Sequence, residues 1–165
     1  MDRVASGMLA GLAATVVLSM IMLVKGMLGL MPELNLAAML GSMMNTTPAM
    51  GWVIHFMIGM LAWGVGFVFF FNVLPGVSDL GKGLSFGIAA WFLMMVVVMP
   101  MAGVSLFGVG MGSMAPAMTL MLHVVYGAVL GLVFGRLEPP KRPLRHPPPH
   151  LKPDPNPILH KHQRS

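Results

Sequence analysis

The chain contains no cysteine, which removes disulfide bonds, thiolate metal sites and cysteine nucleophiles from its chemistry. Charge is also scarce, because only 9% of the 165 residues are Asp, Glu, Lys or Arg. The five carboxylates are Asp2, Glu33, Asp79, Glu138 and Asp154. Since none lies inside a long apolar run, the sequence contains no carboxylate relay for carrying protons across a membrane. It also lacks a catalytic triad, paired acids and a phosphate-binding loop, so we expect a protein that is not an enzyme.

Apolar residues dominate instead, at 56% of the chain, and the mean hydropathy is +0.81. Four apolar runs are each about 20 residues long, enough for a helix to cross about 30 Å of hydrocarbon. They cover residues 4–24, 52–74, 83–103 and 116–136. The first run lacks a convincing cleavage site and is interpreted as a retained span. The alternation typical of a membrane barrel is absent, so the sequence predicts an all-α membrane protein with four transmembrane helices in residues 1–137.

The basic residues predict the orientation of these helices, because Lys and Arg are enriched in cytoplasmic segments. If both termini are cytoplasmic, the outer loops contain only Lys25. The cytoplasmic segments then contain the other nine basic residues, which are Arg3, Lys82, Arg136, Lys141, Arg142, Arg145, Lys152, Lys161 and Arg164. This bias predicts a multi-pass protein of a prokaryotic cytoplasmic membrane. The net charge of +5 then indicates contact with anionic lipid rather than with nucleic acid.

A repeated pattern relates the first two spans to the last two. GMLAGLAA at 7–14 matches GLSFGIAA at 83–90, and PAMGWVIH at 48–55 matches PAMTLMLH at 116–123. Two matches in the same order indicate a duplicated helical hairpin. The two copies cover about residues 4–74 and 80–137. Because each hairpin returns to the side it left, we expect parallel copies related by a pseudo-twofold axis along the membrane normal.

The repeat also pairs two histidines, His55 and His123, at equivalent positions in the second and fourth spans. Small residues four apart form a helix face that packs closely in lipid. The glycines predicted to form such faces are Gly7, Gly11, Gly59, Gly83, Gly87, Gly127, Gly131 and Gly135. Since the histidines share these faces, they are predicted to point into the bundle at one depth. Thr119 and Tyr126 are interpreted as packing residues.

Three interpretations of the histidine pair remain open. The first is a structural contact in which each ring satisfies the other or a backbone carbonyl. The second is ligation of haem b by two imidazoles from different helices, with glycines making room for the macrocycle. The third is a copper site in which Met50 and Met118 add thioether ligands to His55 and His123. Methionine is dense near the predicted outer side, where residues 25–50 and 99–118 contain 11 of the 20 methionines.

The segments outside the spans differ sharply in composition. The first outer loop contains LMPELNLAAMLGSMM at 30–44, where Pro32 and Glu33 suit a helix start and the apolar remainder suits a short interfacial helix. Residues 101–115 are glycine-rich and either cross the surface or re-enter the membrane. Residues 138–165 are rich in proline, histidine and basic residues. This composition predicts a disordered cytoplasmic tail that adheres to anionic lipid.

Four segments resemble an uncharacterised family of small four-span membrane proteins from bacteria and archaea. They are GLMPELN at 29–35, GWVIHFMIG at 51–59, the third span with its flanks at 82–103, and PAMTLMLHVVYGAVLG at 116–131. The resemblance covers about residues 3–137 and implies the four-span topology. It implies no activity and no functional residue, because the family has none assigned.

These patterns favour a non-catalytic function. The leading expectation is a small accessory or structural subunit that packs through its glycine faces against a second copy or a larger membrane complex. The alternative is a redox or metal-binding module that uses His55 and His123. A third hypothesis is a small oligomeric permeation pathway.

Overall fold

A computed structural model describes residues 2–30, 32 and 34–138, so the predicted tail beyond Glu138 lies outside the described residues. Four helices are long and apolar enough to cross a membrane, as the sequence predicts. They are α1 at Arg3–Met27, a second span at Pro48–Phe70, a third at Asp79–Met101, and α7 at Ala115–Leu137. The second span comprises α3 (Pro48–Met57), the π-helical segment η1 (Ile58–Gly64) and α4 (Val65–Phe70). The third comprises α5 (Asp79–Leu93), the π-helical segment η2 (Met94–Val98) and α6 (Met99–Met101).

Polar capping residues explain why the second and third spans begin about four residues before their predicted starts. Thr47 caps α3, where its side chain accepts a hydrogen bond from the Met50 amide and Pro48 occupies the first turn. Ser78 caps α5 and accepts a hydrogen bond of 3.0 Å from the Gly81 amide. The helices therefore extend through polar or small residues that a hydropathy window leaves out.

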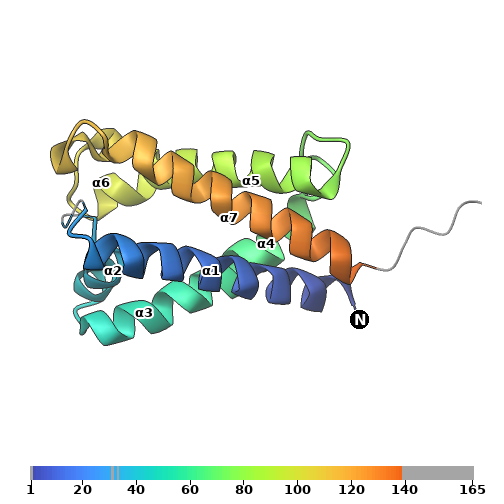
Figure 1. The fold of residues 1–165 in the computed structure, drawn as a ribbon, viewed down its shortest axis with the longest axis horizontal. Helices are drawn as coiled ribbons and strands as arrows, with labels where there is room; N and C mark the ends of the chain where they lie inside the picture. The colour runs from blue at the N-terminus through green and yellow to red at the C-terminus, as the bar shows by residue number, and fades with distance from the viewer. Residues whose placement is uncertain (1, 31, 33, 139–165) are drawn as a thin grey trace, which may run out of the picture.

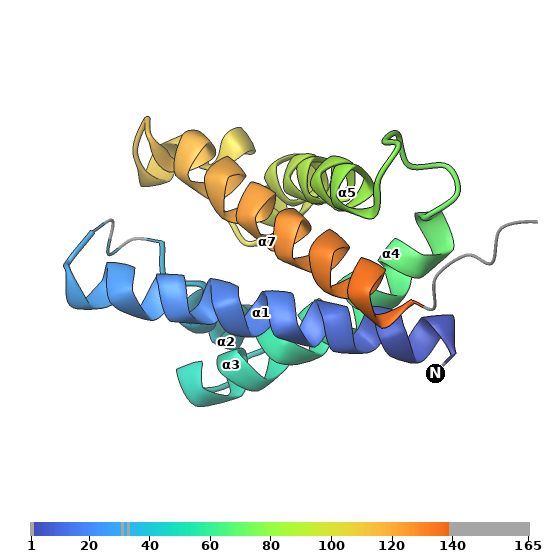
Figure 2. The same cartoon turned by 45° about the vertical axis from the view of Figure 1, so that its right-hand side comes forward.

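The two hairpins lie side by side, with α1 and α7 in contact at the centre (Figure 1). The second span packs against α1, and α5 packs against α7 on the opposite side of this central pair (Figure 2). The N-terminus of α1 and the end of α7 lie at one end of the bundle, together with the connection from α4 to α5. We call this end the terminal end and the opposite end the loop end.

The terminal end is closed by aromatic packing. Phe67 and Phe134 are fully buried, with ring centroids 5.2 Å apart, and Phe67 also meets Phe86 at 5.5 Å. Arg3 lies over the Phe134 ring and forms an ion pair of 3.2 Å with Glu138. These contacts join the first helix to the last and leave the terminal half of the bundle tightly packed.

The loop end contains the smaller elements. The predicted interfacial segment forms α2 at Leu36–Met43, which packs against α3. The helix does not start at Pro32 and Glu33 as predicted, because the Asn35 side chain caps it by accepting a hydrogen bond from the Ala38 amide. Residues 102–114 contain the short 3₁₀ helix η3 at Leu106–Met111. Phe107 in η3 contacts the rings of Trp91 and Phe92 at centroid distances of 6.1 and 6.3 Å. This loop therefore folds back against the third span.

Candidate functional site

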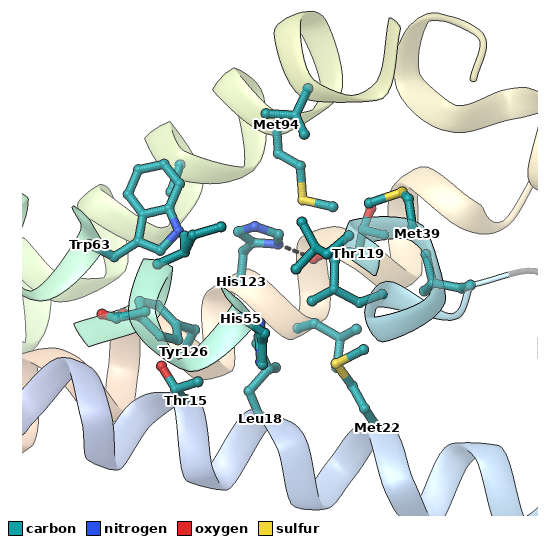
Figure 3. A pocket seen from close by; sticks show the side chains of 18 of the residues that line it. Thr15, Leu18, Met22, Met39, His55, Trp63, Met94, Thr119, His123 and Tyr126 are labelled. Carbon is teal, nitrogen blue, oxygen red and sulfur yellow. Dashed lines mark hydrogen bonds between the residues drawn. The ribbon is translucent and has the colours of Figure 1, made fainter. Parts of the chain in front are cut away.

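A cavity of about 150 Å³ lies in the loop-end half of the bundle (Figure 3). All four spans line it, and α2 and η3 contribute at the loop end. Its wall is almost entirely apolar. The few polar side chains that reach it are Thr15, Asn35, His55, Trp63, Thr119, His123 and Tyr126. No Asp or Glu is among the described residues that line the cavity.

The structure places His55 and His123 on the same cavity, one from each hairpin. His55 lies on α3 and its side chain is only 8% exposed. Its Nε2 atom is buried and forms no hydrogen bond with any residue that the structure describes. The edges of Trp52 and Phe56 pack beside the ring, each at a centroid distance of 5.8 Å. His55 therefore presents a buried polar atom that the described part of the chain does not satisfy.

His123 lies on α7 and its ring is held in a defined orientation. The Nδ1 atom lies 2.8 Å from the backbone oxygen of Thr119. A carbonyl oxygen only accepts hydrogen bonds, so this contact assigns the proton to Nδ1. In the neutral ring, Nε2 is then left with its lone pair available to a ligand. No hydrogen bond joins the two histidines, which line one cavity without satisfying each other.

Two further hydrogen-bonded groups shape the cavity, and both centre on residues that the sequence analysis interpreted only as packing. Trp91 Nε1 donates to Thr119 Oγ1 over 3.1 Å, which ties the third span to α7. Tyr126 donates its hydroxyl to the Gly59 carbonyl over 2.9 Å, which ties α7 to the second span. These bonds connect the cavity wall across helices in a medium where the backbone has no water partner.

Both π-helical segments border the cavity. The first contributes Ile58, Gly59 and Trp63, and the second contributes Met94 and Val98. A π turn adds one residue to the α-helical repeat, which widens the helix and turns the following side chains. Such turns are frequent at functional sites. Neither turn was predicted, because helical spacing by four assumes a regular α-helix throughout each span.

The methionines near the histidines are not the predicted ones. Neither Met50 nor Met118 lines the cavity, and Met50 is 47% exposed. Four other methionines line it, which are Met22, Met39, Met94 and Met111. They come from α1, α2, the second π segment and η3, so only the folded arrangement brings them together.

The predicted glycines lie at close helix contacts inside the chain. A methyl group built on Gly11 would lie 2.8 Å from the Gly64 Cα atom, and one on Gly83 would lie 2.7 Å from the Gly131 Cα atom. Gly7, Gly59, Gly87 and Gly127 meet backbone or side-chain atoms of neighbouring spans at similarly short range, and Gly135 meets the Asp79 side chain. Gly64, which spacing by four did not select, lies at the same helix contact as Gly7 and Gly11. The glycine faces are therefore occupied within this chain.

The cavity volume limits what it could hold. A cavity of about 150 Å³ in another protein holds benzene or xenon, so this one suits an ion or a ligand of that size. The haem macrocycle is much larger, and bis-imidazole ligation would require the spans to move apart. Among the described residues, no three His, Cys, Asp or Glu side chains come together as a metal-ligand group. The two histidines are the only lining side chains among the described residues whose nitrogen offers a lone pair to a ligand, because the nitrogens of Trp63 and Asn35 only donate hydrogen bonds.

The fold and the cavity define a class, that of four-span α-helical membrane proteins with a histidine-lined cavity between two hairpins. Within this class, the chain belongs to a family of unknown function (DUF6789), whose model matches residues 1–144. No curated protein and no solved structure matches the chain significantly.

Proposed function

We propose that this protein is a non-catalytic membrane protein that binds a small ligand in the cavity between its hairpins. The observation that carries this proposal is the pair His55 and His123, which reach one buried cavity from two different hairpins. A buried imidazole nitrogen without a partner is costly, so a bound ligand would compensate for it. Among the other polar side chains of the wall, Thr15, Thr119 and Tyr126 donate their hydroxyls to backbone carbonyls and so give the site its shape.

The proposed location is the cytoplasmic membrane of a prokaryote, with both termini in the cytoplasm. The support is the distribution of Lys and Arg, with Arg3, Lys82 and Arg136 toward the terminal end and only Lys25 toward the loop end. In this orientation the cavity lies in the outer half of the bilayer. The basic tail then contacts anionic lipid on the inner surface, and no nucleic-acid partner is expected.

We also propose that the two hairpins are parallel repeats related by a pseudo-twofold axis along the membrane normal. The support is that matched glycines form the helix contact within each hairpin. The match is inexact, because Gly7 meets Gly64 and Val68, whereas its counterpart Gly83 meets Gly127 and Gly131. When the two hairpins are aligned by sequence, the helix contact in the second hairpin lies about one helical turn away from the position that corresponds to the contact in the first.

The accessory-subunit hypothesis requires a different surface from the one the sequence suggested. Because the glycine faces are occupied inside the chain, association with a second copy or a larger complex would use outward apolar side chains such as Met20, Leu23 and Phe69, which are 63%, 55% and 76% exposed. Outward apolar residues are also what lipid contact requires, so they do not favour a protein partner. Permeation through a single chain is opposed by the packed rings of Phe67 and Phe134 at the terminal end.

A cavity-filling variant tests the proposed function. Ala90 is 4% exposed and lines the cavity, so in Ala90→Leu the three added carbons should occupy the ligand's space. We expect native mass spectrometry of the protein extracted from membranes in mild detergent to show a bound ligand, organic or metal. The Ala90→Leu variant should lose most of it, by about 10-fold or more in occupancy, since overpacking a filled site costs about 1–3 kcal/mol.

The neighbouring residue supplies a matched control. Ala89 is exposed on the outer face of the same helix, so Ala89→Leu adds the same side chain without reaching the cavity. This variant should retain the ligand and the annular lipids of wild type. The proposed function is wrong if no ligand is found, or if Ala90→Leu and Ala89→Leu retain it equally.

A further inference from the structure

The side-chain atoms around the cavity that could ligate a metal are all neutral, and they combine imidazole nitrogen with soft thioether sulfur. Two imidazoles, from His55 and His123, share the wall with the thioethers of four methionines. No described carboxylate lines the cavity. Thioether sulfur favours cuprous copper, and imidazole nitrogen is compatible with it, whereas hard ions such as Mg²⁺ and Ca²⁺ prefer oxygen ligands.

We propose that the cavity binds one cuprous ion, Cu(I), through the Nε2 atoms of His55 and His123 and at least one methionine thioether. The four candidate thioethers are those of Met22, Met39, Met94 and Met111. This inference rests on the proposed function, because it names the ligand of the same cavity. It replaces Met50 and Met118, which do not line the cavity, with methionines that do.

The state of the two rings supports coordination. The Thr119 carbonyl accepts the hydrogen bond from His123 Nδ1, over 2.8 Å, and so orients the ring and leaves Nε2 as the free donor. Histidine ligands commonly have such an outer partner, which fixes the tautomer and raises the basicity of the ligating nitrogen. His55 contributes the second nitrogen, a buried Nε2 atom that forms no hydrogen bond with the described residues.

Several methionines extend toward the same space. Figure 3 shows Met94 projecting from the third span into the region of the His123 ring, and Met22 approaching from α1 on the other side. Met94 is the first residue of the second π segment. Because Met94 follows Ala90 by four residues and Ala90 also lines the cavity, regular helical spacing directs this thioether inward.

Charge favours a monovalent ion in this environment. Burying an ion away from water has a cost that rises with the square of its charge, so a divalent ion would meet about four times the penalty of a monovalent one. The cavity wall supplies no anionic side chain among the described residues to offset that difference. A soft cation of charge +1 is therefore the metal that this wall suits best.

Anaerobic titration of the purified full-length protein tests the site. The four tail histidines, His146, His150, His160 and His162, are replaced by asparagine in every sample so that they do not bind copper. Cu(I) is supplied as its bicinchoninate complex, and we expect the protein to withdraw one equivalent. His55→Ala and His123→Ala should each weaken binding by about 100-fold or more, since losing even an outer partner costs 10–100-fold.

Matched variants separate coordination from general damage. Met50→Leu and Met118→Leu change methionines outside the cavity and should leave the affinity unchanged. His55→Gln and His123→Gln keep a polar side chain, so they should fold like wild type by circular dichroism and still lose copper. X-ray absorption of the wild-type complex should show both nitrogen and sulfur in the first coordination shell.

Three results would overturn the assignment. The first is that no Cu(I) is withdrawn, the second is that folded histidine variants bind it like wild type, and the third is that Zn(II) binds more tightly than Cu(I). A ligand that Ala90→Leu removes, found in a protein that binds no copper, would preserve the proposed function while rejecting the cuprous site. Copper binding that depends on both histidines supports both proposals.

Discussion

We expect Gly127→Ala to lower the free energy of unfolding in detergent by about 1–3 kcal/mol, which is typical of overpacking a tight contact. A methyl group built on Gly127 collides with the Gly83 carbonyl oxygen and lies 3.2 Å from the Gly87 Cα atom. Both obstacles are backbone atoms of α5, so no side-chain rotation relieves them. The larger Gly127→Leu should separate α5 from α7 altogether. Unfolding followed by circular dichroism at increasing denaturant measures the effect.

Gly66→Ala is the control for this prediction. A methyl group on Gly66, also inside a span, meets only the Phe86 ring at an ordinary contact distance of 3.6 Å. Alanine is the better helix former by about 1 kcal/mol in a helix interior, so this variant should be as stable as wild type or more so. If Gly66→Ala destabilises as much as Gly127→Ala, helix contact at the glycines is not the cause.

The span count was predictable because hydropathy is a local property. Each span is a nearly unbroken apolar run, and the lipid requires each run to satisfy its own backbone hydrogen bonds as a helix. The placement of Gly11 and Gly83 against neighbouring backbones was likewise expected from spacing by four. The starts of the second and third spans required the polar caps Thr47 and Ser78, which a hydropathy window excludes.

The cavity could not be predicted, because its lining comes from all four spans and from two short elements whose packing no local pattern determines. Residues five apart, Gly59 and Gly64, share one face of the second span, since the π turn adds a residue between them. Spacing by four selects Trp63 instead, which lines the cavity. The methionines needed the fold as well: Met94 follows the lining residue Ala90 by four, but Met39 and Met111 arrive from segments whose fold the periodicity does not determine.

The two halves of the bundle contrast in a way that suits a binding protein. Near the terminal end, Phe67, Phe86 and Phe134 fill the interior with large rings. Near the loop end, α2 and η3 cover a space that the spans leave open. Rigid packing at one end holds the spans in place, while two short elements at the other end border the ligand site. These covering elements are therefore the parts whose displacement should affect binding most.

Gly51→Ala tests the cover formed by α2. A methyl group on Gly51 collides with the Ala37 carbonyl oxygen and lies 3.0 Å from the Gly41 amide nitrogen, both in the α2 backbone. We expect α2 to move away from α3, because a cost of about 1–3 kcal/mol exceeds what a helix of eight residues gains from its own propensity. Hydrogen exchange of the amides in α2 should accelerate by about 10-fold or more, since each 1.4 kcal/mol of lost local stability is a factor of ten.

Gly26→Ala is the matched control for the cover, because Gly26 lies near the same end, in α1, and a methyl group there meets nothing within 4 Å. Its exchange pattern should equal that of wild type. Because Leu36, Met39 and Leu40 of α2 line the cavity, Gly51→Ala should also weaken ligand retention, whereas Gly26→Ala should not. Fast exchange in α2 with unchanged retention would show that α2 borders the cavity without contributing to binding. Unchanged exchange in Gly51→Ala would mean that α2 is not held by the close contact between Gly51 and the Ala37 carbonyl.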